Sequence, residues 1–333
     1  MHSPSRIIGF GTAMVDAIAA IPDDFLYTIP GDKGGTVKIT EDQMRDILQR
    51  LPEMPARIPG GATANTLAGI AHLLGKGTAA LFALTGNDEN AKFYMDFMKG
   101  EGIDTSRCMS TSLAPTGVCL SLITPDAERT MRSFTGANDL VTPETFPVSV
   151  FDGYHHFFIE GYAFRNTGLG DYLIETADCK GLVVGIDFNA QEIVRENRER
   201  FRRLLKEHVT VAFANEQEAM AFAETDNPED ALQALSECCP IAIVKLGERG
   251  SLIKEKGREV LRIPAVTATA IDTTGAGDLW AAGFYAGWLS GHSLEFSGML
   301  AAHVASEIVK VIGAHLPDAT WSRLQQKMIS LSK

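Results

Sequence analysis

The residues best suited to chemistry lie late in the chain, in the run Ile-Asp-Thr-Thr-Gly-Ala-Gly-Asp at residues 271–278. Gly275, Ala276 and Gly277 predict a tight turn at the start of a helix, where the first backbone amides have no partner within the helix. Such amides, together with the positive end of the helix dipole, bind anions. Asp278, in the first helical turn, is suited to accept a proton from a hydroxyl group that attacks phosphorus. The segment therefore predicts phosphoryl transfer; the simpler alternative is an acidic residue that only complements the helix dipole.

These residues need a framework, and the chain supplies strands that alternate with helices. Five apolar runs are predicted to be strands buried on both faces: Arg6–Phe10, His156–Glu160, Leu182–Phe188, Val209–Ala214 and Ile241–Leu246. Helices are predicted at Ala64–Leu74, Asn90–Glu101, Asn166–Cys179, Arg195–His208, Glu216–Glu224, Pro228–Cys238, Ala276–Leu289, Leu294–Ile312 and Ala319–Leu331. This alternation is typical of an α/β fold in which helices cover a largely parallel sheet.

Two segments interrupt the alternation. The stretch Tyr27–Thr40 is rich in turn residues, and Thr116–Phe134 consists of two β-rich runs around the turn Pro125-Asp126-Ala127. Together they predict a small antiparallel sheet outside the main one, which is either a lid over a site or an ordinary edge hairpin. Because no repeat or linker divides the chain, we expect one α/β domain with a modest insertion.

The composition argues against several classes of binding partner and indicates the cellular compartment of the protein. The 333 residues carry a formal net charge of −12, which disfavours nucleic acid and anionic membrane surfaces as partners. The five cysteines have no Cys-x-x-Cys spacing, which indicates reduced thiols, and no apolar run reaches the ~18 residues of a membrane-spanning helix. We therefore expect a cytoplasmic protein. A Gly-Phe-Gly run at 9–11 lacks the third glycine of a dinucleotide fingerprint, which argues against a nicotinamide dehydrogenase.

Several motifs together resemble one family. The run at 272–278 is similar to the C-terminal signature of the ribokinase-like (PfkB) carbohydrate and nucleoside kinases, and Gly-Gly-Ala-Thr-Ala-Asn at 60–65 resembles their Gly-Gly-x-x-x-Asn loop. Asn-Glu-Gln-Glu at 215–218 matches their Asn-x-x-Glu motif, and the segment 244–250 resembles the strand and turn that approach the nucleotide. The resemblance implies a ribokinase-like three-layer α/β/α sandwich with a mostly parallel central sheet and a small β lid. It also implies a single kinase domain over residues 1–333, with lid segments at about 27–40 and 113–135.

The resemblance also implies roles for individual residues. Carboxylate, amide and backbone groups that bind the hydroxyls of an acceptor are expected at Asp16, Gly60, Gly61 and Asn65. Residues that bind ATP are expected at Asn215, Lys245, Gly247, Gly250 and His303. The expected catalytic group is Asp278 as the base, with the backbone at Gly275, Ala276 and Gly277.

Arg129 is a further catalytic candidate. Glu-Arg-Thr at 128–130 resembles the basic segment that follows the lid strands of the family, and a guanidinium group there could meet the transferring phosphate. A surface salt bridge with Glu128 or Asp126 explains the same residue equally well.

The resemblance implies metal ions as well as ATP. Glu218 is expected to hold Mg²⁺ through water, because this cation keeps much of its hydration when it bridges nucleotide phosphates. Asp272 and Thr274 resemble positions beside a monovalent-cation site, which makes K⁺ a further candidate cofactor.

The acceptor is less constrained than the class of reaction. Pro-Thr-Gly-x-Cys at 115–119 and Gly-Ala-Asn at 136–138 are most similar to the adenosine kinase branch, and aromatic residues at 162 and 164 could contact a base. We expect transfer of the γ-phosphoryl group of ATP to a hydroxymethyl group of an adenosine-like nucleoside. The alternatives are a fructose- or ribose-type sugar kinase and a catalytically silent ligand-binding protein of the same fold. The expected partner is this small molecule, with the chain acting as a monomer or homodimer.

Overall fold

The main sheet has eight strands in the order β15-β14-β13-β12-β11-β10-β1-β5 in a computed structural model, which describes residues 5–126, 128–165 and 168–332. The strands are β1 (Ile7–Phe10), β5 (Ala79–Phe82), β10 (His156–Glu160), β11 (Val183–Asp187), β12 (Val211–Asn215), β13 (Ile241–Lys245), β14 (Ser251–Glu255) and β15 (Leu261–Ile263). The strands from β5 to β13 are parallel, and β14 and β15 continue the sheet in antiparallel pairing. The predicted largely parallel sheet is confirmed.

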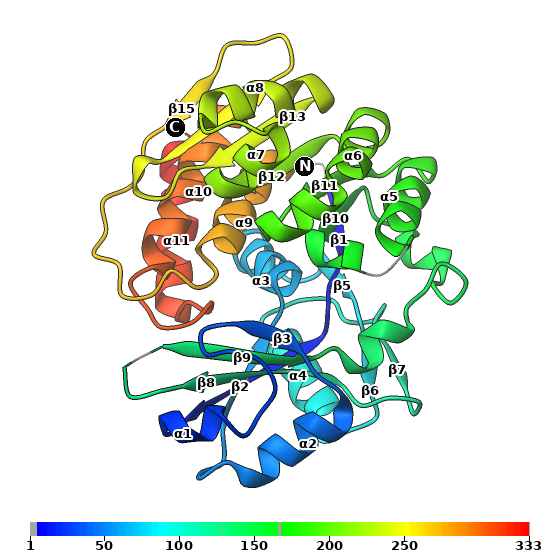
Figure 1. Ribbon diagram of the computed structural model, residues 1–333. Coiled ribbons are helices and arrows are strands. Elements are labelled where there is room, and N and C mark those ends of the chain that lie inside the picture. The colour runs from blue at the N-terminus through cyan, green and yellow to red at the C-terminus, as the bar shows by residue number, and fades with distance from the viewer. Residues whose placement is uncertain (1–4, 127, 166–167, 333) are drawn as a thin grey trace.

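Helices cover both faces of this sheet (Figure 1). One face packs on α3 (Ala62–Leu74), α9 (Ala276–Leu289), α10 (Leu294–Ile308) and α11 (Asp318–Leu331). The other packs on α5 (Leu169–Cys179), α6 (Gln191–Glu207), α7 (Glu216–Ala223) and α8 (Pro228–Cys238). Successive strand residues point to opposite faces, so Ile7 joins the first apolar core and Ile8 the second. The result is the expected three-layer α/β/α sandwich.

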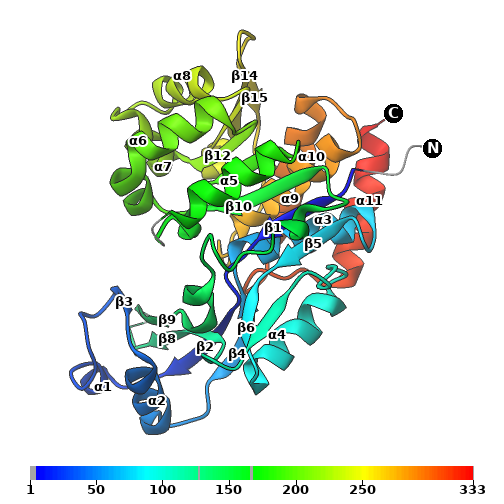
Figure 2. The same ribbon diagram turned by 90° about the vertical axis from the view of Figure 1, so that its right-hand side faces the viewer.

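A separate five-stranded sheet lies beside the main one (Figure 2). Its order is β3-β9-β8-β2-β4, formed by β2 (Met14–Ala20), β3 (Thr36–Lys38), β4 (Ala56–Gly60), β8 (Gly117–Ile123) and β9 (Arg129–Phe134). One face packs on α1 (Asp23–Leu26) and α2 (Glu41–Arg50). The predicted antiparallel pairing holds for β8 with β9 and for β2 with β4, but the sheet as a whole is mixed, because β2 pairs with β8 in parallel and β3 with β9 in parallel. Strand β2 follows β1 in the chain, and it was not predicted to belong to this sheet.

Smaller differences concern where elements begin and end. Helix α4 (Glu89–Gly100) lies within one residue of the predicted Asn90–Glu101, and the chain also forms the short strands β6 (Leu84–Gly86) and β7 (Met109–Thr111). Helix α10 ends at Ile308 rather than Ile312, and α6 begins four residues before the predicted Arg195. Ala127 of the predicted turn and Asn166 of the predicted helix lie outside the described residues. Among the helices formed by the described residues, none is long and apolar enough to cross a bilayer.

Close packing of α3 against α9 depends on Gly69. A Cβ atom at Gly69 would lie 2.6 Å from the Cβ of Ala282 and 3.1 Å from a methyl carbon of Leu279. Both neighbours belong to the buried helix α9, and the Cβ of Ala282 is fixed to the backbone, so it can move only if that helix shifts. The absence of a side chain therefore sets the separation of the two helices, and with it the relative position of residues near their N-termini.

We predict that Gly69→Ala lowers the free energy of unfolding by about 1–2 kcal/mol. Overpacking of a core costs about 1–3 kcal/mol, and the higher helix propensity of alanine returns up to about 1 kcal/mol. Urea unfolding measures the change. Gly100→Ala in α4 is the matched control, because no atom lies within 4 Å of a Cβ there. Equal stability of the two variants would contradict the packing role of Gly69.

Candidate active site

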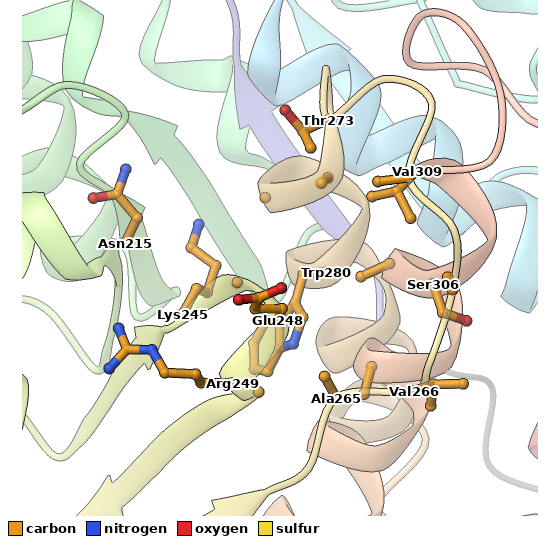
Figure 3. A pocket seen from close by; sticks show the side chains of 18 of the residues that line it. Asn215, Lys245, Glu248, Arg249, Ala265, Val266, Thr273, Trp280, Ser306 and Val309 are labelled. Carbon is orange, nitrogen blue, oxygen red and sulfur yellow. The ribbon is translucent and has the colours of Figure 1, made fainter.

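A cavity of about 990 Å³ lies at the carboxyl ends of the parallel strands. The ends of β11, β12 and β13, the turn after β13, the loop 265–270 and the N-terminus of α9 all contribute to its walls. Figure 3 shows Asn215 and Lys245 on one side and Ser306 and Val309 across from them. This edge is where open α/β sheets bind ligands, and the volume suits a nucleotide.

Lys245 supplies a positive charge at one end of the cavity. Its ammonium group lies 2.6 Å from the carboxylate of Asp187, the last residue of β11. Burial disfavours the charged amine, but the negative charges of Asp187 and Glu218 outweigh it and raise the pKa of Lys245. A Cβ atom on Gly277 would lie 3.2 Å from Nζ of Lys245, so the glycine leaves room for the amine beside the N-terminus of α9. This arrangement favours an anion between Lys245 and α9.

The turn before α9 has the geometry that its glycines predict. Gly275 is the N-cap residue, with a φ of 72°, which glycine adopts readily. The amide of Ala276 donates to the carbonyl of Thr273 at 3.1 Å, so it is not available as the sequence predicted. Among the described hydrogen bonds, the amides of Gly275, Gly277 and Asp278 have no protein acceptor. These three amides can therefore bind an anion.

Asp278 connects the cavity to residues 60–65, the acceptor loop that the family resemblance predicts. Its carboxylate lines the cavity and accepts a hydrogen bond of 2.8 Å from the side-chain amide of Asn65. Burial, reinforced by the nearby charge of Asp187, raises the pKa of Asp278 to about 7, although the bond from Asn65 and the charge of Lys245 oppose the change. An aspartate with this pKa can exchange a proton near neutral pH. The pairing joins residues 213 positions apart.

The predicted acceptor residues lie together. A Cβ atom on Gly60 would lie 2.6 Å from a carboxylate oxygen of Asp16, and Gly61 begins α3 with a φ of 114°. Asp16 accepts no hydrogen bond from the described residues, and burial raises its pKa to about 6, with the charge of Arg129 acting in the opposite direction. Oδ1 of Asn65 is also buried without a partner within the described part of the chain. Asp16 and Asn65 thus offer free acceptor groups to a polyol.

Arg129 is an exposed residue at the start of β9. Its Nε donates to the hydroxyl of Ser121 at 3.0 Å. Its positive charge opposes the rise in the pKa of Asp16 that burial causes, and it contributes to the lowered pKa of Asp272. Within the described ranges it forms no ion pair, and Asp126 binds Lys33 instead, at 2.6 Å. The geometry therefore does not support the salt-bridge alternative with Asp126.

Glu218 and Asn215 form a capping box at the start of α7. The two oxygens of Glu218 accept from the backbone and side-chain amides of Asn215, at 2.8 and 2.7 Å. Glu218 is 2% exposed, and burial together with the charge of Asp187 raises its pKa to about 7. No cluster of three or more metal-ligating side chains occurs among the described residues. One or two carboxylates are sufficient for Mg²⁺ on a nucleotide, so Glu218 and Asp187, which both line the cavity, fit this ion.

Asp272 organises the loop before α9. One carboxylate oxygen accepts from the amide and hydroxyl of Thr274, and the other accepts from the amide of Gly313 at 2.8 Å. Burial opposes ionisation of this carboxyl, but these hydrogen bonds outweigh it and lower the pKa of Asp272. Any cation at this place would depend on backbone carbonyls for much of its coordination.

One residue that was expected to bind the nucleotide lies outside the cavity, and three polar residues in or beside the site were not predicted to belong to it. Gly247 and Gly250 line the cavity, but His303 does not. On α10 it is Ala302 that faces the cavity, and the next residue points roughly 100° away around the helix. The missed residues end strands or lie in a short turn, and they are Glu160, Asp187 and Asn138. Glu160 and Asp187 lie at the carboxyl ends of predicted parallel strands, and this position could have identified them as site residues.

Glu160 holds the two segments that flank the acceptor site. One carboxylate oxygen accepts from the amide and hydroxyl of Thr12, and the other accepts from the amide and hydroxyl of Thr63 at 3.0 and 3.1 Å. Glu160 is 1% exposed, so these four bonds replace the water that its carboxylate would otherwise bind. The start of α3, which carries Asn65, is fixed in this way.

Known proteins share this sequence and fold. Residues 36–321 match the model of the pfkB family carbohydrate kinases. Adenosine kinase of Saccharomyces cerevisiae is 24% identical over 94% of this chain and 97% of its own length. The crystal structure of adenosine kinase from Sinorhizobium meliloti has a TM-score of 0.83 at 30% identity, covering 97% of this chain and 99% of that one. A probable sugar kinase from Rhizobium etli CFN 42 has a TM-score of 0.83 at 28% identity, covering 98% and 99%.

These matches extend over most of the chain, and they confirm the resemblance carried by the motifs at 60–65, 215–218 and 272–278. The family match at 36–321 contains β3, β4, β8 and β9 of the five-stranded sheet and all the residues that line the cavity. The chain therefore belongs to the pfkB family of carbohydrate kinases, phosphotransferases whose acceptor is an alcohol group.

Proposed function

We propose that the protein transfers the γ-phosphoryl group of ATP to a hydroxymethyl group of an adenosine-like nucleoside. The observation that carries this proposal is the position of Asp278. It lies in the first turn of α9, lines the large cavity, and contacts Asn65 of the acceptor loop at 2.8 Å. A base placed between a nucleotide cavity and a hydroxyl-binding cluster is what transfer between two bound substrates requires.

The residues of the site have different roles in the transfer of the phosphoryl group. Asp278 takes the proton of the acceptor hydroxyl as its oxygen bonds to the γ-phosphorus, and the bond from that phosphorus to the oxygen of the β-phosphate breaks to release ADP. The amides of Gly275, Gly277 and Asp278 stabilise the negative charge on the migrating group, and Lys245 adds a positive charge beside Gly277. Mg²⁺ supplies charge neutralisation on the phosphates when bound, and Glu218 with Asp187 would hold it through water.

Two features suit a nucleoside as the acceptor, and the second of them distinguishes it from a free sugar. Asp16 and Asn65 offer free oxygens to vicinal hydroxyls such as those of a ribose. Of the aromatic segment after β10, Phe164 is buried in the core, whereas Tyr162 is 37% exposed. Burial raises the pKa of the Tyr162 hydroxyl, and the negative charges of Glu160, Glu218 and Asp278 add to the effect. The guanidinium of Arg165 lies 4.7 Å from the centroid of the ring. An exposed ring here suits a base.

The five-stranded sheet is proposed to act as a lid, because Arg129 on β9 lies close enough for its charge to act on both Asp16 of β2 and Asp272 of the loop before α9. We also propose K⁺ as a cofactor beside Asp272 and Thr274, with carbonyl oxygens of the adjoining loops as further ligands. Omission of K⁺ from the assay, with the ionic strength held constant by a bulky organic cation, tests this part separately.

Turnover with a panel of acceptors tests the proposed function. ADP formation with ATP and Mg²⁺ is measured with adenosine, other nucleosides, ribose and fructose. The proposal predicts the highest kcat/KM for adenosine. A higher value for ribose or fructose would identify a sugar kinase, and ligand binding with no turnover on any acceptor would identify a silent binding protein.

Asp278→Asn should reduce kcat by about 10²–10⁴-fold, because it removes the proton acceptor and keeps the shape of the side chain. ATP affinity, measured by calorimetry, should change less than about threefold. Asp318→Asn is the matched control, since Asp318 is an exposed acid in the first turn of α11. Near-normal turnover of Asp278→Asn would eliminate the base assignment and leave only a helix-dipole role.

Glu218→Gln should raise the Mg²⁺ concentration needed for half-maximal activity by about tenfold, because one negative ligand of the hydrated ion is lost. A magnesium titration at saturating ATP provides the measurement. Glu216→Gln is the control from the same helical turn, where Glu216 pairs with Arg249 at the surface. An identical titration of both variants would argue against a metal role for Glu218.

The pKa of Asp278 predicts how activity depends on pH. The base must be ionised, and burial raises its pKa from 3.8 to about 7. The logarithm of kcat/KM should therefore rise with a slope near one up to about pH 7 and then level off. This limb should persist in Glu218→Gln and disappear from the residual activity of Asp278→Asn. A flat profile between about pH 5 and pH 7 would show that Asp278 is not the titrating base.

A further inference from the structure

Two sequence motifs have no part in the proposed chemistry, and the structure places them against each other. They are Pro-Thr-Gly at 115–117, before β8, and Gly-Ala-Asn at 136–138, in the short helix η1 (Gly136–Leu140) after β9. The amide of Ala137 donates to the carbonyl of Pro115 at 2.8 Å. A Cβ atom on Gly136 would lie 2.2 Å from that same carbonyl oxygen. Neither motif lines the cavity, so their contact serves another purpose.

The side chain of Asn138 joins the segments at this contact. Its Oδ1 accepts from the amide of Ala13 at 2.9 Å, and its Nδ2 donates to the carbonyl of Ala13 at 2.9 Å and to that of Thr135 at 2.8 Å. Asn138 is 8% exposed, so water does not compete for these bonds. The amide group thus pairs with Ala13 as a neighbouring strand would, at the place where the chain passes from β1 in the main sheet to β2 (Figure 2).

Three strands of the five-stranded sheet begin or end beside Asn138. Strand β2 begins one residue after Ala13, β8 begins at Gly117, and β9 ends one residue before Thr135. Gly117 pairs with Met14, and a Cβ atom on Gly117 would lie 2.9 Å from both the carbonyl of Ala13 and Nδ2 of Asn138. The strands that enter and leave the sheet are therefore held together by one buried amide.

Asp16 follows Ala13 by three residues on β2 and pairs with Cys119 on β8. Its carboxylate makes no hydrogen bond within the described residues that could fix its position independently. The position of Asp16 therefore follows from where β2 starts and from its register with β8. Both are set at Ala13 and Gly117, where Asn138 lies.

We propose that Asn138 is a positioning residue for the acceptor, which acts by holding β2 so that Asp16 faces the acceptor hydroxyls. The inference rests on the proposed function, in which Asp16 binds those hydroxyls. It also gives the motifs at 115–117 and 136–138 a role in the alignment of strands rather than in the choice of base.

Asn138→Ala should lower kcat/KM for the acceptor by about 10–100-fold, since displacements of about 1 Å have effects of this size. The affinity for ATP alone should change less than about threefold, because Asn138 is outside the cavity. Asp139→Asn is the matched control from the same turn: it removes an exposed ion pair with Lys38 and should resemble the wild type. Parallel losses of acceptor and ATP binding would overturn the proposal.

A double-mutant cycle separates positioning from a general effect on stability. If Asn138 acts through Asp16, then Asn138→Ala in an Asp16→Asn background should cost less than about threefold in kcat/KM. The same fold loss in both backgrounds would overturn the proposal. Should Asn138→Ala not fold, Asn138→Asp keeps the oxygen that accepts from Ala13 but, when ionised, loses both donated bonds, and it enters the same cycle.

Hydrogen exchange gives a readout that does not depend on turnover. In Asn138→Ala, peptides covering residues 14–20 should exchange faster than in the wild type, while peptides from β12 and β13 keep their rates. Unchanged exchange at 14–20, or equal acceleration throughout, would overturn the proposal. An absence of turnover with every acceptor would contradict the proposed function and leave this measurement to decide the role of Asn138.

Discussion

The hydrogen bond between Asn65 and Asp278 is the interaction on which the site depends. It joins the helix that begins at the acceptor loop to the helix that begins at the anion-binding turn, and it requires the close approach of α3 and α9 at Gly69. Glu160 fixes the start of α3 from the other side through Thr63. The two halves of the site are therefore aligned by packing and hydrogen bonds within the main body.

Buried carboxylates outnumber buried cations at the site. Asp187, Glu218 and Asp278 lie near one another, and Lys245 is the cation among them. Burial of so many carboxylates raises the pKa of Glu218 and Asp278, and this is unfavourable for the isolated protein. A nucleotide with bound Mg²⁺ would reduce the repulsion between these carboxylates. Binding would therefore recover part of the free energy that their burial costs the protein.

Local signals predicted the part of the site that is local in sequence. Helix α9 begins and ends at the predicted residues, because Gly275 marks its start and an apolar run defines its length. The placement of β2 was missed because its pairing with β8 joins residues about a hundred positions apart, which no local pattern reports. Glu160 was not predicted because it is the last residue of an otherwise apolar strand. His303 was expected to bind the nucleotide, but its neighbour Ala302 lines the cavity instead. The family motifs pointed to Asp16 and Asn65 despite these long-range gaps, whereas the bonds from Asn138 to Ala13 and Thr135 are seen only in the folded chain.

The central claim is that Asp278 touches the hydroxyl that receives the phosphoryl group. A crystal structure with adenosine and a non-hydrolysable ATP analogue measures this most directly. The account predicts a carboxylate oxygen of Asp278 at about 2.6–3.2 Å from the ribose hydroxymethyl oxygen, with the terminal phosphate at the amides of Gly275 and Gly277. A separation beyond about 5 Å, with no intervening water, would contradict it.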